Sequence, residues 1–197
     1  MIISLAIIFF VLGIIIGSFL NVVIFRFNTH RSYMGRSGCM TCHKKLHWYE
    51  LFPIFSYLFL KGRCKGCRTR ISLQYPIVEF ITGLIFAGLF LKFKNTFFLD
   101  TIGFTISYTY YALIFSIMIV ISVYDLKHKI IPDILALVLG IFSFVGIFLF
   151  IDYKFTSHWP TLLEVASGVI IALPFALMWF FSKGKWMGLG DAKLAIS

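Results

Sequence analysis

The residues with the clearest chemical potential are two aspartates, each at the end of an apolar segment. Asp191 closes the motif Gly188-Leu189-Gly190-Asp191, and Asp125 ends an earlier apolar run. An aspartate at the mouth of a membrane segment is costly and is by default a candidate functional residue. The two glycines remove side chains, which would let another backbone approach the carboxylate closely.

A pair of aspartates suits a specific reaction. Two carboxylates held close together cannot both ionise, so they share a proton. One then activates water as a base while the other polarises a peptide carbonyl, as in aspartyl proteases. Helix-dipole stabilisation does not explain Asp125, because an acid at a helix C-terminus is unfavourable. The alternative to a catalytic role for Asp125 is a solvated loop residue paired with Lys129. Asp133 instead fits a first-turn acid that complements a helix dipole.

All four cysteines of the chain fall in two Cys-x-x-Cys pairs, with 21 residues between the pairs: Cys39 with Cys42, and Cys64 with Cys67. Two pairs at this spacing predict a tetrahedral zinc site with four thiolate ligands, and redox chemistry is the alternative. Four protein ligands leave no position for water, so the predicted site is structural. We expect the nearby His43 and His47 not to bind the metal.

The composition indicates a membrane protein that crosses the bilayer several times. The 197 residues are 60% hydrophobic and 13% charged, with a mean hydropathy of +0.94. Segments of about 20 apolar residues match the thickness of a bilayer. A signal peptide is the alternative for the first segment, but that segment lacks a basic start and is too long. We expect spans over 1–25, 75–91, 104–123, 131–151 and 162–181, and the start of another at 192.

The distribution of basic residues predicts the orientation. Residues 26–74 carry ten Lys and Arg against one acid, Glu50. If this loop is cytoplasmic, 15 of the 18 basic residues lie on the cytoplasmic side, as the positive-inside rule requires. The net charge of +10 is then an orientation signal with some attraction to membrane lipid, and it does not indicate nucleic-acid binding. The N-terminus would lie outside.

Five blocks in the first half of the sequence stand out: 17–26, 46–50, 53–57, 62–67 and 71–79. Together with Asp125 and the motif that ends at Asp191, they resemble the type IV prepilin peptidase family, in the order typical of that family. The block at the end of the first span is similar to the family's N-terminal signature, and the blocks in the loop are similar to its cysteine-containing domain. The resemblance covers essentially the whole chain.

The resemblance implies a bifunctional enzyme of the bacterial inner membrane. Such enzymes cut the leader from prepilins or pseudopilins on the cytoplasmic side and methylate the new N-terminal residue, usually phenylalanine, with S-adenosylmethionine. Asp125 and Asp191 match the catalytic aspartates, the four cysteines match the zinc-binding domain, and Gly62 matches a glycine linked to methylation. The implied fold is all-α, of the Gly-x-Gly-Asp intramembrane protease type. Its parts are a first helix (1–25), a cytoplasmic zinc-binding domain (26–74) and a peptidase domain (75–197).

Two departures from the family pattern stand out. Met40 replaces a frequent proline between the first two cysteines, and the chain stops just after Asp191, where relatives run on, which suggests a fragment. The alternative function is a non-enzymatic zinc-knuckle scaffold of a secretion or competence apparatus. That scaffold would explain the cysteines and the spans, but not two aspartates on one face. The sequence assigns neither an individual prepilin nor an oligomeric state.

Overall fold

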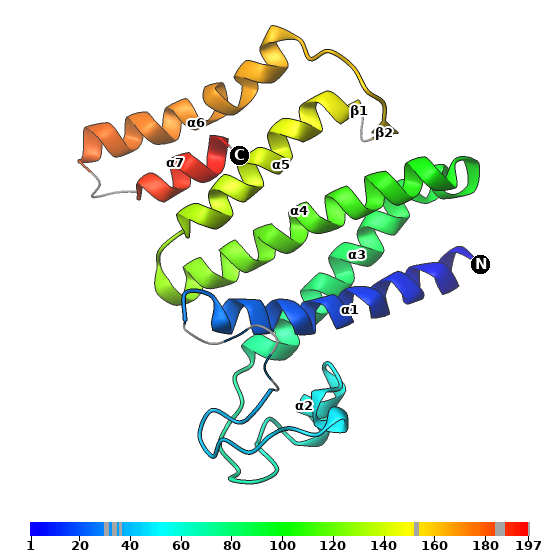
Figure 1. The fold of residues 1–197 in the computed structure, drawn as a ribbon, viewed down its shortest axis with the longest axis vertical. Helices are drawn as coiled ribbons and strands as arrows, with labels where there is room; N and C mark the ends of the chain where they lie inside the picture. Colours follow the sequence, from blue (N-terminus) through cyan, green and yellow to red (C-terminus); the bar gives the residue numbers. More distant parts are fainter. Residues whose placement is uncertain (30–31, 33–34, 36, 152–153, 184–187, 197) are drawn as a thin grey trace. The chain divides into compact units, whose positions relative to one another are not determined.

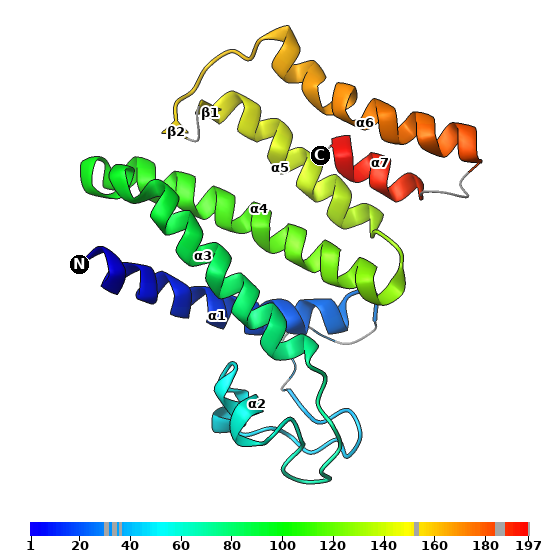
Figure 2. The same cartoon turned by 180° about the vertical axis from the view of Figure 1, so that it is seen from behind.

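Long apolar helices make up nearly all of the fold (Figures 1 and 2). The computed structural model describes the chain except for residues 30–31, 33–34, 36, 152–153, 184–187 and 197. The chain forms two compact units, Met1–Lys92 and Phe93–Ser197. In chain order the elements are α1 (Ile2–Arg26), η1 (Trp48–Leu51), α2 (Phe55–Phe59), α3 (Gln74–Leu99), α4 (Thr101–His128), α5 (Asp133–Leu149), β1 (Phe150–Ile151), β2 (Lys154–Phe155), α6 (Leu162–Ser182) and α7 (Leu189–Ile196).

Four of these helices, α1, α3, α4 and α6, are long and apolar enough to cross a membrane. Helix α5 has 17 residues, which at 1.5 Å per residue span about 25 Å, slightly less than a bilayer core of about 30 Å. The protein is therefore a multi-pass helical membrane protein. The short antiparallel pair of β1 and β2, with Phe150 opposite Phe155, is a small departure from an all-α fold.

Helices α3 and α4 extend beyond the expected spans, whereas α5 starts two residues later and ends two residues earlier than the expected span over 131–151. Helix α3 continues to Leu99, because no proline or glycine interrupts residues 92–99. The Asp100 carboxylate then accepts the backbone N–H groups of Ile102 and Gly103 and caps α4. At its other end, α4 includes Asp125 in its last turn and stops where Lys129 adopts a left-handed conformation.

In the first unit, α1 packs antiparallel against α3 through small residues. A Cβ on Gly13 would lie 2.8 Å from the Cα of Gly83, and one on Gly17 would lie 2.8 Å from the Cα of Glu79. Only glycine allows backbones to approach so closely, as the small-xxx-small pattern of α1 predicts. Asn21, which is polar within the span, donates its amide N–H to the Tyr75 carbonyl at 3.1 Å.

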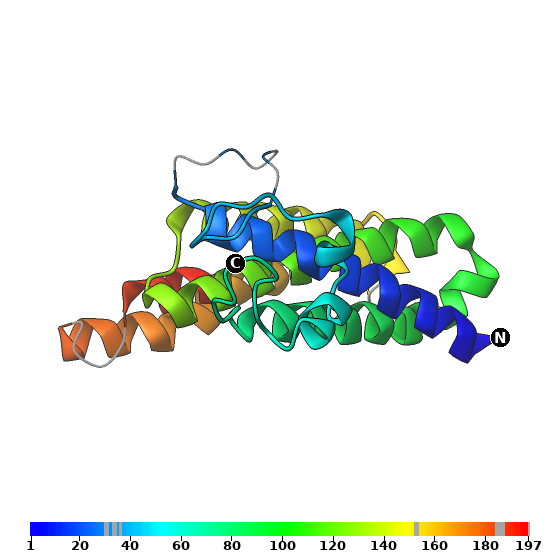
Figure 3. The ribbon, with the colours of Figure 1, turned by 90° about the horizontal axis from the view of Figure 1, so that it is seen from below.

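A loop connects the end of α1 to the start of α3, and its described residues have little regular structure besides η1 and α2 (Figures 1 and 3). Phe25 and Tyr75 stack at 4.8 Å where the two helices enter this loop. The loop therefore starts and ends at one place on the helix pair.

In the second unit, α4 and α5 pack antiparallel around Tyr110. Its hydroxyl donates to the Phe142 carbonyl at 2.9 Å and lies close to Gly146, where a larger residue would collide with it. Its ring stacks on Phe150 at 4.3 Å. Helix α7 lies between the start of α5 and the end of α6 and contacts both helices (Figures 1 and 2).

Candidate functional site

Asp125 lies in the last turn of α4 and is half-buried. Its backbone carbonyl accepts the N–H of Lys129 at 2.6 Å, which closes the helix. An ionised carboxylate at this end of a helix meets the negative pole of the helix dipole, so stability alone does not explain an acid here.

Asp191 lies in the first turn of α7 and is also half-buried. The residue before it, Gly190, contacts Ile131 of the α4–α5 connection, and a Cβ on this glycine would lie 3.2 Å from the Ile131 side chain. Gly190 thus allows a close approach to a side chain, not to a backbone. Gly188 has no such neighbour within the part of the chain that the structure describes. The contact brings Asp191 to the end of the second unit that carries Asp125.

Asp133 has a partner that the sequence did not predict. It is in the first turn of α5, as expected, and its carboxylate also accepts the Lys193 ammonium at 2.7 Å. Lys193 is two residues after Asp191, so this ion pair ties the start of α7 to the start of α5. Both side chains are exposed, and such pairs stabilise proteins by about 0–1 kcal/mol.

The four cysteines form a cluster in the loop of the first unit. All four Sγ atoms lie within 4.8 Å of one another, although the two pairs are far apart in sequence. The Sγ atoms of Cys39 and Cys67 are 3.7 Å apart, close to the roughly 3.8 Å between sulfurs around a tetrahedral zinc with 2.3 Å bonds. The cysteines are positioned to bind one metal ion.

Each cysteine pair lies in a knuckle, and the two knuckles share one hydrogen-bond pattern. The backbone carbonyl of the first cysteine of each pair accepts a hydrogen bond from the N–H of the residue four positions later. The distance is 3.0 Å for Cys39 and 2.9 Å for Cys64. Those residues, His43 and Arg68, both have a left-handed backbone. The backbone therefore turns in the same way twice and directs both thiols of each pair to one point.

The thiols have different affinities for protons. The Thr69 hydroxyl, 3.2 Å from Sγ, and the Thr69 backbone N–H lower the pKa of Cys67 to about 6. The backbone N–H of Cys42 lowers the pKa of Cys39. The Lys44 N–H acts to lower the pKa of Cys42, but the neighbouring cysteine sulfurs and desolvation outweigh it and raise this pKa to about 11. Four thiolates at one point therefore require a bound cation.

Replacing Thr69 by valine should release the metal at a higher pH. Metal is held while the thiolates are ionised and is lost as the pH falls and protons compete for them. The variant loses the hydroxyl and raises the pKa of Cys67 from about 6 toward 9.0. We expect the midpoint of release to rise by about half a pH unit, measured with a chromogenic chelator during acid titration.

The matched control for this change is Thr41→Val in the first knuckle, where the threonine acts on Cys39 through its backbone N–H. This variant should release metal at the pH of the unmodified protein. Identical release curves for Thr69→Val and Thr41→Val would mean that the hydroxyl does not act on Cys67.

The loop histidines have other surroundings. Among the described residues, the group with metal-binding geometry contains the four cysteines and neither His43 nor His47. His47 precedes η1, donates its backbone N–H to the Glu50 carboxylate at 2.8 Å, and stacks its ring on Tyr49 at 5.3 Å.

A larger cavity of about 690 Å³ lies between the cysteine knuckles and the adjoining ends of α1 and α3, and a smaller one of about 570 Å³ lies between η1 and α2. The lining of the larger cavity combines charged, polar and apolar groups. Asn21, Glu50 and Glu79 line it and are 1%, 8% and 5% exposed, and the Asn21 Oδ1 has no hydrogen-bond partner among the described residues. Cys39 and Cys64 also line it. A buried unpartnered oxygen costs free energy, so this cavity is suited to a polar ligand.

Glu79 holds the loop to α3, a role that the sequence did not reveal. Its carboxylate accepts the Ile54 N–H at 2.7 Å. Ile54 has φ +60°, and the N–H of Phe55 donates to the Pro53 carbonyl at 2.6 Å across it, which makes a strained γ-turn. A β-branched residue rarely adopts this conformation, so the contact with Glu79 fixes the start of α2.

Gly62 also supports the larger cavity. It has φ +64°, and a Cβ on it would lie 2.7 Å from the hydroxyl of Tyr57, which lines the cavity. Only glycine fits both the left-handed backbone and the space beside Tyr57. A larger residue would displace Tyr57 and change the cavity.

Two family models match consecutive parts of the chain. The bacterial peptidase A24 N-terminal domain matches residues 11–93, and the type IV leader peptidase family matches residues 112–197. The first match contains the cysteine cluster and both cavities' lining residues, and the second contains Asp125 and Asp191.

Three curated relatives share one name, prepilin leader peptidase/N-methyltransferase. The protein of Myxococcus xanthus is 39% identical over 64% of this chain and 36% of its own length. The protein of Bacillus subtilis is 35% identical over 64% of this chain and 48% of its own length. The protein of Xanthomonas campestris is 30% identical over 93% of this chain and 68% of its own length. The chain thus spans less than half the length of the first two relatives. No solved structure matches significantly.

Proposed function

Because the chain belongs to the type IV leader peptidase family, we propose that it is a membrane aspartyl endopeptidase that removes the leader of type IV prepilins or pseudopilins and then N-methylates the new N-terminal residue. The observation that carries the peptidase half is the packing of Gly190 on Ile131, which holds Asp191 at the end of the second unit where α4 places Asp125. A non-enzymatic scaffold would have no use for this arrangement.

In this proposal the two aspartates divide the work. One carboxylate, ionised, takes a proton from water and so generates the nucleophile. The other, protonated, donates a hydrogen bond to the scissile carbonyl and stabilises the charge that develops on its oxygen. Two carboxylates brought together on a substrate would share one proton, and these two roles need that division.

The proposed orientation follows from charge. The loop of residues 26–74 would face the cytoplasm, the N-terminus would lie outside, and the membrane would be the bacterial inner membrane. Fifteen of the 18 basic residues then lie on the cytoplasmic side. Leader cleavage would take place on that side, where Asp125 lies in the last turn of α4 and Asp191 in the first turn of α7.

We propose zinc as the metal of the cysteine cluster. Four thiolates in a tetrahedral arrangement are typical of structural zinc sites, and the distance between Cys39 and Cys67 fits this geometry. All four ligands come from the protein, so the ion would organise the loop and would not activate water. It would hold both knuckles against the larger cavity, which Cys39 and Cys64 line.

S-adenosylmethionine is the proposed methyl donor, and the larger cavity is its proposed site. A nucleoside joined to an amino acid needs polar and apolar contacts together. Asn21, Glu79 and Glu50 offer acceptors, and the aromatic ring of Tyr57 is also in the lining. The donor supplies a methyl group on a positively charged sulfur; the residues of this chain would bind and orient it.

Replacing Gly62 by aspartate should block methylation while leaving leader cleavage largely intact. The new side chain would require a strained backbone at φ +64° and would displace Tyr57 from the lining of the larger cavity. The aspartates of the other unit are untouched. We expect methylation to fall at least about tenfold, as one lost contact of about 1.4 kcal/mol would cause, with both products read by mass spectrometry.

Lys61→Asp is the matched control, because it adds an acid at the neighbouring exposed position without entering the space beside Tyr57. Aspartate tolerates the left-handed backbone of Lys61. Equal loss of cleavage and methylation in a Gly62→Asp protein with normal metal content would contradict this division of labour.

The proposed function is tested by co-expression of the full-length protein with a candidate prepilin. Mass spectrometry of the recovered pilin should show loss of the leader and a gain of one methyl group at the new N-terminus. Intact prepilin in membranes that contain abundant, metal-loaded protein would refute the peptidase assignment for that substrate class.

A further inference from the structure

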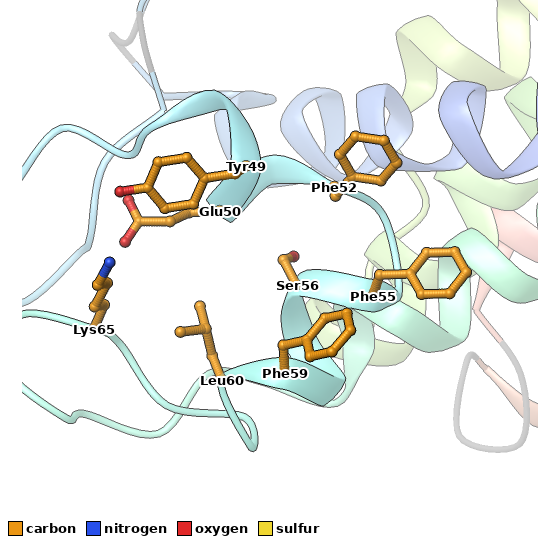
Figure 4. A pocket seen from close by; sticks show the side chains of 8 residues that line it. All are labelled: Tyr49, Glu50, Phe52, Phe55, Ser56, Phe59, Leu60 and Lys65. Carbon is orange, nitrogen blue, oxygen red and sulfur yellow. The ribbon is translucent and has the colours of Figure 1, made fainter.

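A second cavity, of about 570 Å³, lies in the loop between η1 and α2 (Figure 4). Its two ends differ in chemistry. One end has Tyr49, Glu50 and Lys65, and the other has Phe52, Phe55 and Phe59. None of the residues discussed for metal binding or leader cleavage lines it.

The rings at the aromatic end are exposed. Phe52, Phe55 and Phe59 are 54%, 56% and 84% exposed, although such side chains are normally covered. Several large apolar side chains on one face usually mark a binding surface. The γ-turn at Ile54, held by Glu79, fixes the start of α2 and so presents these rings in a defined position.

The polar end contains a carboxylate that calls for a cation. Glu50 is the single acid among ten basic residues in positions 26–74, and it is only 8% exposed. The His47 N–H occupies one of its oxygens, while a carboxylate has about four acceptor positions. Burying a carboxylate costs free energy unless hydrogen bonds or a charge compensate it, so a cationic ligand would be favoured here.

Lys65 restricts what kind of cation fits. Its ammonium lies 5.1 Å from the centre of the Tyr49 ring and lines the same end of the cavity. A ligand at this end therefore needs a cation for Glu50 and an adjacent acceptor for Lys65. The first residue of a peptide has both, an α-ammonium followed by a backbone carbonyl.

We propose that this cavity binds the N-terminal residue of the processed substrate, with its free α-ammonium at Glu50, its carbonyl toward Lys65 and an aromatic side chain among Phe52, Phe55 and Phe59. The inference rests on the proposed function, because leader removal is the step that creates the free terminus. Glu50 and Lys65 also line the larger cavity, so a terminus bound here would adjoin the proposed site of the methyl donor.

The test measures peptide binding to the full-length protein in lipid nanodiscs by fluorescence anisotropy. The probe is a hexapeptide with N-terminal phenylalanine, polar residues after it and a dye at its C-terminal end. N-acetylation of this peptide, or alanine in place of its phenylalanine, should each weaken binding at least tenfold. Empty nanodiscs report any binding to lipid, and acetylation requires no change in the protein.

Protein variants locate the effect. Glu50→Gln should weaken binding of the free-amine peptide about tenfold and remove the difference between free and acetylated peptides. Phe59→Ala should weaken binding of the phenylalanine peptide and leave the effect of acetylation unchanged. Leu58→Ala, which alters an exposed residue of the same helix outside the cavity, should bind like the unmodified protein. Metal content verifies that each loop is folded.

Three outcomes would overturn the proposal. The first is equal affinity of the unmodified protein for free and acetylated peptides, and the second is an equal loss of affinity for both peptides in Glu50→Gln. The third is crosslinking to lipid alone from a photoreactive phenylalanine at position 59. The last would assign the aromatic surface to the membrane. Leader cleavage by the same preparations keeps the two hypotheses apart. Cleavage without peptide binding refutes this site, and peptide binding without cleavage refutes the proposed peptidase.

Discussion

Replacing either Asp125 or Asp191 by asparagine is expected to abolish leader cleavage. The two carboxylates would act as one unit, so either single change removes the shared proton and with it both the base and the acid. Losses of this kind are of the order of 10³-fold or more, and the double variant should be no worse than either single one. Asparagine preserves side-chain size, so the helices and the metal content should be unchanged.

The measurement is cleavage of a matched prepilin in membranes that contain each full-length variant at equal abundance. Asp133→Asn is the first control, since its loss removes an exposed ion pair with Lys193 worth about 0–1 kcal/mol. Glu79→Gln is the second, because the amide oxygen of glutamine still accepts the Ile54 N–H. Substantial cleavage by Asp125→Asn or Asp191→Asn would falsify the dyad and move attention to Asp133 or Glu79.

Loss of metal from Cys64→Ser is the second large effect we expect. Cys64 is the buried member of the cluster, and serine offers a poor ligand in place of a thiolate. Structural zinc sites contribute about 10–16 kcal/mol of apparent binding free energy, which is also folding free energy for the loop. Elemental analysis should show close to one zinc per chain in the unmodified protein and little in Cys64→Ser or Cys39→Ser.

Limited proteolysis should show the structural consequence, with the loop between α1 and α3 cleaved readily in the metal-free variants. The control is His43→Asn, because the described metal-binding group does not contain His43 and asparagine tolerates its left-handed backbone. A metal-free protein whose loop still resists protease would show that the cysteines serve another purpose, with Cys-x-x-Cys redox chemistry the next candidate.

Local features of the sequence predicted most of the architecture. Apolar runs of about 20 residues predicted membrane spans, and four helices of sufficient length and apolarity confirm a multi-pass protein. The boundaries were less accurate, because charged and polar residues at a span's end can remain helical. Residues 92–99 extend α3 through an expected connector, and the break comes only at Asp100, where a side-chain cap starts the next helix.

The sequence also identified the cysteines and acids considered for the functional site, but not the contacts that these side chains make. Spacing alone predicted a metal site at the four cysteines, and their sulfurs do converge. Nothing in the sequence paired Lys193 with Asp133, or Glu79 with the Ile54 N–H, since each pair is joined only by the path of the backbone. One unused signal was present: Glu50 is the lone acid of a basic loop.

The sequence by itself determined the class of protein, the approximate spans and the four cysteines that converge on one point, because hydropathy and ligand spacing act over short stretches of chain. The tertiary structure alone decided which glycine of the Gly188–Asp191 motif makes contact, that the exposed rings of Phe52, Phe55 and Phe59 share a cavity with Glu50, and that Gly62 must remain small beside Tyr57. These features depend on contacts between distant segments, which form only when helix packing and the turns of the loop fix the backbone.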